Sequence, residues 1–359
     1  MEKLRELILA TLKNYDKENI RIGTIGSHSA LNILKGAKEE GFETVCIVRK
    51  RESFVYRNFG VADHIIEVDD FRQLLDDGIQ KKLIEMNTIL IPHGSYNAYI
   101  GSLYSLKVPV FGNRILMEWE TVREKQRDWL VNSGLNVPKT YRSPDEIDGL
   151  AIVKYPGARG GKGYFIAASK EDFLSKAEEL VKRGIISKDD INKAHIQEYV
   201  LGVPVYFSFF YSPVNSRIEL IAIDRRYESN VDGFGRIPAD EQLKTDLIPT
   251  YTVVGNIPLI VRESLLSRIL QDGEQVYEYS RKIAEPGMVG PFCLESVIDE
   301  NGTIYYFEIS ARIVAGSSVG IPASPYSYIL FGENMYMGRR IAREIRIATE
   351  KDMLEELIF

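Results

Sequence analysis

The sequence has few cysteines and no long apolar run, and each shortage excludes a class of protein. Only two cysteines occur among 359 residues, Cys46 and Cys293. Both lie in apolar stretches, so we expect two buried, reduced thiols and not a disulfide scaffold. No apolar stretch approaches the roughly twenty residues that cross a bilayer. The first residues include Glu2, Glu6 and Asp16, where a signal peptide would be apolar. We therefore expect a cytoplasmic protein that does not enter a membrane.

A large excess of one charge is also lacking. Lys and Arg number 45 against 51 Asp and Glu, which gives a formal net charge of -6. This balance supplies no general positive field for nucleic acid or an anionic membrane, so any anionic ligand must be held locally. Hydrophobic residues make up 45% and charged residues 27%, as in ordinary globular chains. The length predicts two or three domains.

Residues 20–115 alternate strand-like and helix-like segments, after an amphipathic helix expected over the first fifteen residues. Such alternation predicts an α/β domain with a parallel sheet. Ligands of these sheets bind beyond the carboxyl ends of the strands. Two of those ends, 26–29 and 93–96, are polar and contain glycine, so we expect both loops to face one crevice. The expected strands are 20–25, 44–48, 64–68, 88–92 and 108–111, and the expected helices are 29–40 and 71–86.

A different pattern begins near Asn113 and predicts an α+β region. We expect an N-terminal domain over 1–115 and a second domain over 116–359, with subdomains of about 116–197 and 198–359. The expected helices are 119–133, 170–183, 262–284 and a charged terminal helix over 338–357. The expected strands are 151–155, 164–168, 194–200, 205–211, 218–224, 288–298 and 303–309.

A glycine-rich stretch between two expected strands indicates a phosphate-binding hairpin. Gly157, Gly160, Gly161 and Gly163 leave the backbone N–H groups unobstructed, and Lys154 and Lys162 add positive charge. A Walker A loop is excluded, because Lys162 is followed by glycine and a β-like run instead of Ser or Thr and a helix. The alternative is a mobile turn whose lysines serve solubility.

A second hairpin carries two carboxylates. The strands around Glu295 and Glu308 are joined by a turn at 299–302 that ends in Asn-Gly, which makes them antiparallel and brings the two glutamates close together. In an apolar setting the two carboxylates raise each other's pKa unless a cation lies between them. Mg²⁺, held by one or two carboxylates and by substrate phosphates, fits that position. Arg312 follows four residues later. The alternative is two hairpin glutamates that point into solvent.

A third stretch, 196–202, is a strand that ends at a leucine and a glycine. Such an end exposes backbone groups that an adenine edge can recognise, and the alternative is an edge strand that meets a turn. The three elements follow one another in the order and rough spacing of the ATP-grasp superfamily: the glycine-rich hairpin, then this strand, then the carboxylate hairpin. The sequence therefore resembles that superfamily over about residues 115–345, and the α/β region before it resembles the superfamily's usual preceding domain.

Within the superfamily the resemblance narrows to one family, the archaeal formate-dependent 5-formaminoimidazole-4-carboxamide ribonucleotide (FAICAR) synthetases. Five stretches carry it, at 26–38, 224–233, 254–258, 290–295 and 307–316. The resemblance implies an ATP-dependent ligase of purine (IMP) biosynthesis. It would formylate 5-aminoimidazole-4-carboxamide ribonucleotide (AICAR) through formyl phosphate and be a homo-oligomer. The alternatives are a paralogous ligase for another acid or amine and a nucleotide-binding protein without catalysis.

The resemblance also assigns roles to residues. Mg²⁺, or Mn²⁺ in its place, would be held by Glu295 and Glu308. Charge on the transferred phosphoryl group would be neutralised by Lys154 and Arg312 as well. The residues implied for ATP are Lys125, Lys154, Gly160, Gly161, Lys162, Gly163, Glu198, Tyr199, Val200 and Glu228, and those implied for AICAR are His28, Ser95 and Asn256. The loop at 26–29 suits the 5′-phosphate of AICAR, to which His28 would add a hydrogen-bond donor.

Two positions depart from the superfamily pattern. Ser310 stands where many members have an Asn that binds a second metal ion, so the number of metal ions stays open. Gly202 is followed by Val-Pro-Val, where others often carry an acidic residue for the ribose hydroxyls, and Glu228 is the substitute that we expect for it.

Overall fold

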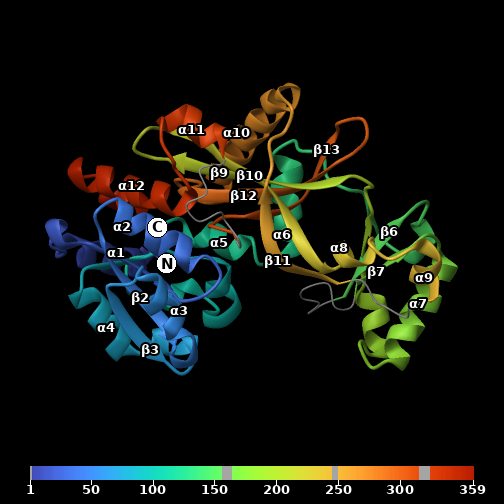
Figure 1. Cartoon of the computed structure of the whole chain (residues 1–359), viewed down its shortest axis with the longest axis horizontal. Helices are drawn as coiled ribbons and strands as arrows, with labels where there is room; N and C mark the ends of the chain where they lie inside the picture. The colour runs from blue at the N-terminus through green and yellow to red at the C-terminus, as the bar shows by residue number, and fades with distance from the viewer. Residues whose placement is uncertain (1, 156–163, 245–249, 315–323) are drawn as a thin grey trace.

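The computed structural model describes residues 2–155, 164–244, 250–314 and 324–359. Its N-terminal part is a four-stranded parallel sheet with strand order β3-β2-β1-β4, which confirms the expected α/β domain (Figure 1). The strands are β1 (Arg21–Ile25), β2 (Glu43–Arg49), β3 (His64–Val68) and β4 (Thr88–Leu90). The helices are α1 (Glu2–Lys13), α2 (Ala30–Glu39), α3 (Ser53–Phe59) and α4 (Asp77–Glu85).

Two helices expected from the sequence are shorter in the structure. The segment 71–86 forms a 3₁₀ turn at Phe71–Leu75 and then α4, because Asp70 caps the turn and Asp76 is extended. In the segment 119–133 only α6 (Arg123–Asn132) is helical, because a separate helix, α5 (Arg114–Trp119), ends at Trp119 and Val122 is extended. The expected strand at 108–111 pairs only through isolated bridges.

The middle of the molecule is a five-stranded antiparallel sheet with order β11-β10-β9-β12-β13. One face packs on α10 (Leu266–Ile283), where Phe209 and Phe292 stack with centroids 5.1 Å apart. The other face carries the polar residues discussed below. The strands are β9 (Val203–Ser212), β10 (Arg217–Asn230), β11 (Tyr251–Pro258), β12 (Gly290–Ile298) and β13 (Ile304–Ser310). Two short helices follow β10, namely α8 (Val231–Phe234) and α9 (Ala239–Lys244), and a third, α11 (Pro325–Phe331), lies after β13.

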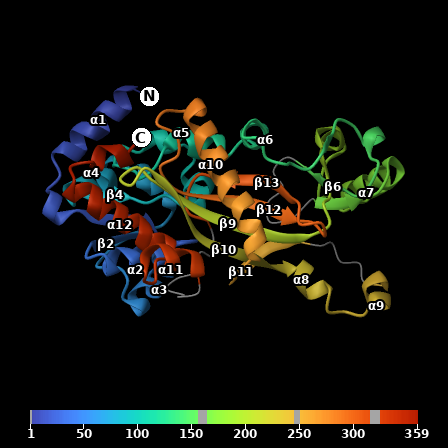
Figure 2. The ribbon, with the colours of Figure 1, turned by 90° about the horizontal axis from the view of Figure 1, so that it is seen from above.

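A third, smaller sheet forms a lobe with α7 (Lys170–Lys182) on the side of the central sheet away from the N-terminal domain (Figure 2). Its order is β5-β8-β6-β7, from β5 (Thr140–Tyr141), β6 (Ala151–Lys154), β7 (Tyr164–Ala167) and β8 (His195–Glu198). The antiparallel pairing of β6 with β7 confirms the expected hairpin. The glycines between them lie outside the described residues.

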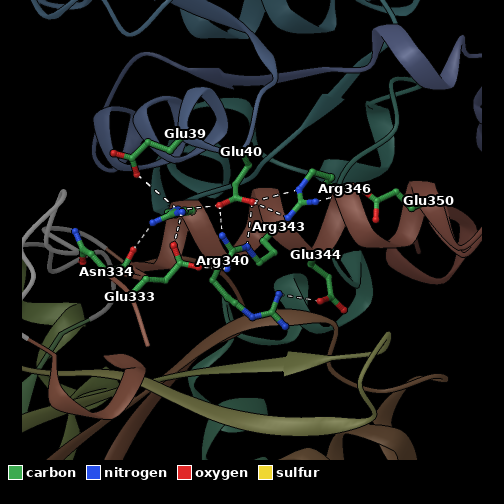
Figure 3. A network of polar contacts seen from close by, with 10 residues as sticks. Glu39, Glu40, Glu333, Asn334, Arg340, Arg343, Glu344, Arg346 and Glu350 are labelled. Carbon is green, nitrogen blue, oxygen red and sulfur yellow. Dashed lines mark hydrogen bonds and ion pairs between the residues drawn. The ribbon is translucent and has the colours of Figure 1, made fainter. Parts of the chain in front are cut away.

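The C-terminal helix α12 (Met337–Glu350) returns to the N-terminal domain and packs against α2. Glycine permits the close approach, since a Cβ on Gly36 would lie 2.2 Å from the backbone N of Arg339. Glu40, at the end of α2, accepts hydrogen bonds from three arginines of α12, which are Arg339, Arg343 and Arg346 (Figure 3). Burial alone would raise the pKa of Glu40, but these guanidinium groups outweigh it and lower the pKa.

The division into domains 1–115 and 116–359 stays a prediction. The three separate sheets support it, whereas α12 crosses it by packing on α2. In the described part of the chain, none of the helices is both long enough and apolar enough to cross a bilayer.

Candidate functional site

Glu295 of β12 and Glu308 of β13 lie directly opposite each other in the antiparallel register. Opposed residues share a face, with Cβ atoms about 5 Å apart. The register shifts next to this pair, because Ser296 is opposite Tyr306 and Phe307 is the extra residue of a β-bulge. Without the bulge, Glu308 would share the α10-facing side with Tyr306; the bulge places it beside Glu295 instead. The expected proximity of the two glutamates is confirmed.

Arg226, which was not predicted from the sequence, forms an ion pair with Glu295 of this pair. Arg226 of β10 donates from Nη1 and Nη2 to the two carboxylate oxygens of Glu295, at 2.9 and 2.5 Å. Its guanidinium also lies 4.2 Å from the ring centroid of Tyr206. Even so, burial and the neighbouring Glu308 raise the pKa of Glu295 to about 7, against the opposing effect of Arg226. Two carboxylates therefore share a site that one guanidinium does not fully neutralise.

Lys154, at the end of β6, approaches the same carboxylates from the small lobe. Its Nζ donates to Gln197 Oε1 at 3.3 Å. Burial lowers the pKa of Lys154, the charges of Glu308 and Glu295 oppose that change, and Arg123 adds to it. The structure thus brings Lys154 into electrostatic contact with the predicted metal ligands, as the sequence analysis expected.

Arg123 is a second residue that the sequence analysis missed. It is the first residue of α6, and its Nη2 donates to the hydroxyl of Tyr164 at 3.4 Å. Lys125, predicted as a phosphate ligand, is exposed, with its Nζ 5.3 Å from the ring centroid of Trp119. The structure therefore brings Arg123, two positions before Lys125, toward Lys154.

The residues predicted for adenine lie where β8 leaves the small lobe. The carboxylate of Glu198 accepts from the backbone N of Lys139 at 3.0 Å, and the backbone N of Tyr199 donates to Leu150 O at 2.8 Å. Burial, followed by the proximity of Tyr199 and Glu228, raises the pKa of Tyr251 to about 12. Glu228 and Tyr199 thus meet at Tyr251, and Val200 is half-buried beside them. The other predicted ATP residues, Gly160, Gly161, Lys162 and Gly163, lie outside the described residues.

The two loops of the N-terminal domain meet in one crevice, as predicted. The rings of His28 and His93 are stacked, with centroids 5.3 Å apart and planes 3° apart. The hydroxyl of Ser95 donates to the hydroxyl of Ser27 at 3.1 Å. Asn256 belongs to another part of the site, since it pairs with Arg226 across β11 and β10.

Arg312 connects the crevice to the sheet. Its Nε donates to Glu120 Oε1 at 2.9 Å. A Cβ on Gly94 would lie 3.3 Å from the Cζ of Arg312 and 2.9 Å from Nε2 of His28, so Arg312 and His28 flank the same small space. Glu120 lies at the break between α5 and α6 and is buried. The sequence analysis missed it because a buried glutamate at a helix end has no motif.

The carboxylate pair fits a divalent cation that is bound partly by a substrate. Nowhere in the described residues do three or more His, Cys, Asp or Glu side chains gather into a metal-binding group. Glu295 and Glu308 supply two ligands, the number expected where phosphates complete the shell of Mg²⁺. A carboxylate has about four lone-pair sites, so Glu295 can keep Arg226 and still bind a cation.

Comparison with known proteins agrees with this geometry. Residues 172–359 match a family described as a domain of unknown function, DUF1297, and residues 22–141 match a protein of unknown function, DUF1246. The chain is 63% identical, over 100% of both chains, to 5-formaminoimidazole-4-carboxamide-1-(beta)-D-ribofuranosyl 5'-monophosphate synthetase of Archaeoglobus fulgidus. It is 48% identical, over 99% of both chains, to the protein of the same name from Methanocaldococcus jannaschii.

The chain belongs to the FAICAR synthetase family. Among solved structures, it resembles the IMP biosynthesis protein PurP of Thermococcus kodakaraensis with a TM-score of 0.74 and 31% identity, covering 94% of this chain and 100% of that one. The biotin carboxylase domain of a Hydrogenobacter thermophilus 2-oxoglutarate carboxylase, in complex with MgADP, has a TM-score of 0.63 at 13% identity, covering 90% of this chain and 68% of that one. Such neighbours confirm the predicted ATP-grasp fold.

Proposed function

We propose that this protein catalyses the ATP- and formate-dependent formylation of AICAR to FAICAR in purine biosynthesis, as an ATP-dependent ligase that forms a C–N bond. The full-length similarity to FAICAR synthetases supports this activity. The observation that carries it is the arrangement of the site. The facing pair Glu295 and Glu308 lies between Lys154 of the small lobe and Arg312 at the crevice of the N-terminal domain.

The first step needs positive charge, because formate and the γ-phosphate of ATP are both anions. Two unit charges 4 Å apart repel by about 1 kcal/mol in water and about 4 kcal/mol at an effective dielectric of 20. Lys154 neutralises charge from the small lobe, Arg123 from the start of α6, and Arg312 from the crevice. Mg²⁺, when bound to Glu295 and Glu308, supplies further charge neutralisation to the nucleotide phosphates. No covalent nucleophile of the protein is required.

The second step joins the AICAR amine to the formyl group. His28, Ser95 and Asn256 are the residues that we assign to AICAR. The loops of His28 and Ser95 lie together in the crevice, and Asn256 reaches the site from β11. Formyl phosphate would be lost to water in an open site, and we assign the covering of the site to the glycine-rich hairpin between β6 and β7.

The metal and nucleotide are part of this proposal. ATP and Mg²⁺ are supported by the ATP-grasp neighbour in complex with MgADP. Mn²⁺ in place of Mg²⁺ rests on the chemistry of the site alone, since carboxylate and phosphate oxygens bind either ion. To test this choice, bound metal is removed with a chelator and initial rates are measured after adding back Mg²⁺ or Mn²⁺. A rate without metal equal to the rate with Mg²⁺ would remove the metal from the mechanism.

An omission assay tests the activity. ADP release is measured with ATP and Mg²⁺, and formate and AICAR are added singly and jointly. We expect full turnover, together with FAICAR, only when both are present. Turnover with another acid or amine would support a paralogous ligase, and no ADP release under any condition would support a binding protein. None of the structural observations favours either alternative.

We also propose that the protein forms a homo-oligomer and is located in the cytoplasm. Apolar side chains are exposed on α11 and on β11, the edge strand of the central sheet. They are Tyr328, Ile329 and Leu330 on α11, and Val254, Ile257 and Ile260 on or after β11. Ile329 is 79% exposed, so Ile329→Asp should leave the fold intact and reduce the mass in light scattering to that of one chain. A wild-type mass of one chain would reject the oligomer.

A further inference from the structure

The hydrogen bonds around His28 determine which of its ring nitrogens carries the proton. The hydroxyl of Ser29 lies 2.7 Å from the carbonyl oxygen of Val314, to which it must donate, because a carbonyl cannot donate. Nδ1 of His28 lies 2.9 Å from the same hydroxyl. The single hydroxyl proton is already used, so His28 must donate from Nδ1 and Ser29 must accept. A neutral His28 therefore has a lone pair on Nε2.

Because the Ser29 hydroxyl is hydrogen-bonded to His28 and Val314, Ser29 does not cap the helix that it precedes. It is the N-cap residue of α2, yet its side chain makes no capping hydrogen bond. A serine cap typically contributes about 1 kcal/mol to a helix. Its hydroxyl instead joins His28 to Val314, in the segment after β13 that also contains Arg312. His28 itself has a left-handed backbone, with φ of 52°, which is uncommon for a residue with a side chain.

Nε2 of His28 faces a space that a larger neighbour would close. A Cβ added to Gly94 would come within 2.9 Å of Nε2 and 3.3 Å of the Cζ of Arg312. The absence of a side chain at Gly94 thus keeps a hydrogen-bond acceptor and a guanidinium close together and unobstructed on this side. An acceptor suits a reactant that donates an N–H, and a guanidinium suits one that carries negative charge.

The stacked partner of His28 has the opposite tautomer. Nε2 of His93 lies 3.0 Å from the carbonyl of Ile25, to which it must donate, and Nδ1 accepts from the backbone N of Ser95 at 3.3 Å. His93 is fully enclosed, with both nitrogens used. Of the two rings, His28 is the one that, among the described residues, keeps a ring nitrogen without a partner beside Arg312, so the two histidines have different roles.

We propose that Nε2 of His28 accepts a hydrogen bond from the AICAR amine, and that Ser29 and Val314 fix the tautomer that makes this possible. The inference rests on the proposed function, and it names the atom at which the amine is recognised. It differs from the donor role expected from the sequence, because the one N–H of neutral His28 is taken by Ser29. Arg312, across the same space, holds the anionic formyl phosphate.

The proton balance of the step agrees with this role. The amine nitrogen forms a C–N bond with the formyl carbon, the C–O bond to phosphate breaks, and one amine proton ends on the phosphate as HPO₄²⁻. His28 is neutral before and after. A hydrogen bond to Nε2 fixes the rotation of the amine, so that its lone pair faces the formyl carbon. The other tautomer would place two N–H donors face to face.

The charge state of His28 supports a neutral acceptor. Enclosure by the crevice, followed by the charges of His93, Arg312 and Arg226, lowers its pKa to about 3. His28 is nevertheless exposed in part. The positive charges of the two arginines, which lower the pKa as well, therefore support the neutral ring alongside burial.

Nitrogen-15 NMR of ring-labelled histidine tests the tautomer without any turnover. The chain has only four histidines, and His28→Gln identifies the signal of His28. Near neutral pH we expect His28 to be protonated at Nδ1 alone and His93 at Nε2 alone. Ser29→Ala should convert His28 to a mixture and leave His93 unchanged, and Ser29→Thr should restore the Nδ1 form. A wild-type His28 protonated at Nε2, or an unchanged His28 in Ser29→Ala, overturns the inference.

Kinetics then test the consequence. With the fold verified by circular dichroism, Ser29→Ala should lower kcat for FAICAR by about five- to tenfold, the worth of one hydrogen bond, with the KM for ATP changed less than about twofold. Gly94→Ala should weaken AICAR binding and leave ATP titration unchanged. Equal losses for ATP and AICAR would indicate a structural role and reject the proposal. If wild type makes no FAICAR, the proposed function and this step both fail, while the NMR result still decides the tautomer.

Discussion

Glu120 holds Arg312 through an ion pair of 2.9 Å, although the two residues are 192 positions apart in the chain. The other carboxylate oxygen of Glu120 accepts from the backbone N of Ala311. Glu120 comes from the break between α5 and α6, and Arg312 follows β13. One buried carboxylate thus fixes both the backbone and the side chain that bring a positive charge to the crevice, where it lies close to His28.

Glu120→Gln should therefore act through Arg312. The amide has one acceptor oxygen in place of two, so it would present an N–H either to the backbone N of Ala311 or to Arg312. The oxygen that accepts from Arg312 also accepts from Asn97. We expect kcat to fall by about tenfold, as for one lost hydrogen bond to a charged group, with ATP affinity unchanged. The control is Glu118→Gln, at a half-buried position of α5 whose carboxylate accepts from Ser102 and not from Arg312. Normal kcat for Glu120→Gln would show that Arg312 needs no such support.

Glu308→Gln removes one charge from the carboxylate pair. Turnover should fall by at least about a hundredfold, because loss of one group that stabilises charge in the transition state typically costs that much. The fold should stay intact. The matched control is Glu300→Gln, an exposed glutamate in the turn of the same hairpin. Steady-state rates and thermal unfolding of both variants check this, and a near-normal rate for Glu308→Gln would exclude it from the mechanism.

Arg123 and Lys125 offer a direct comparison within one helix. Arg123 is in electrostatic contact with Lys154, whereas Lys125 lies over Trp119. We expect Arg123→Gln to raise the KM for ATP by about tenfold, which is the worth of one hydrogen bond to a phosphate. Lys125→Gln should change it by less than about twofold, as for an exposed charge. The reverse order would restore Lys125 to the role that the superfamily resemblance assigned to it.

The network around Glu40 predicts a pH-dependent stability (Figure 3). The pKa of Glu40 lies below its ordinary value of 4.5, so its charge stabilises the fold above that pH, and the contribution is lost as the pH falls through the folded-state pKa. Glu40→Gln should cost about 3 kcal/mol near neutral pH, as for a broken buried ion pair.

The difference between Glu40→Gln and wild type should shrink in acid, where both side chains are neutral. Calorimetry as a function of pH measures it. Glu350→Gln, at the exposed end of the same network, should cost at most about 1 kcal/mol at any pH. A loss for Glu40→Gln that stays constant down to acid pH would show that packing, and not charge, accounts for it.

The sequence was sufficient to predict the elements whose pattern is local. The parallel strands of the N-terminal domain, the hairpin of β6 and β7, and the antiparallel hairpin of β12 and β13 all follow from alternation, glycine and an Asn-Gly turn. The β-bulge at Phe307 does not follow from them. Strict alternation would have placed Glu308 with Tyr306, so the prediction of facing glutamates rested on the turn alone.

What the sequence did not reveal depends on contacts between distant segments. Arg123 and Glu120 carry no motif, and Arg226 lies in the stretch 224–233 without a role that its neighbours reveal. Each gains its role from a partner that lies far along the chain. The tautomer of His28 likewise depends on a carbonyl near the opposite end of the sequence. Helices 71–86 and 119–133 were predicted too long, because Asp76 and Val122 are extended where periodicity continues.

Oxygen-18 transfer tests the central claim most directly, since the claim is that formate is activated as formyl phosphate beside Glu295 and Glu308. Formate labelled with ¹⁸O is supplied with ATP, Mg²⁺ and AICAR, and the released phosphate is analysed by mass spectrometry. Attack of formate on the γ-phosphate leaves one formate oxygen on the phosphate, so we predict one ¹⁸O atom in each phosphate and one in each FAICAR. Unlabelled phosphate released alongside FAICAR would contradict the account.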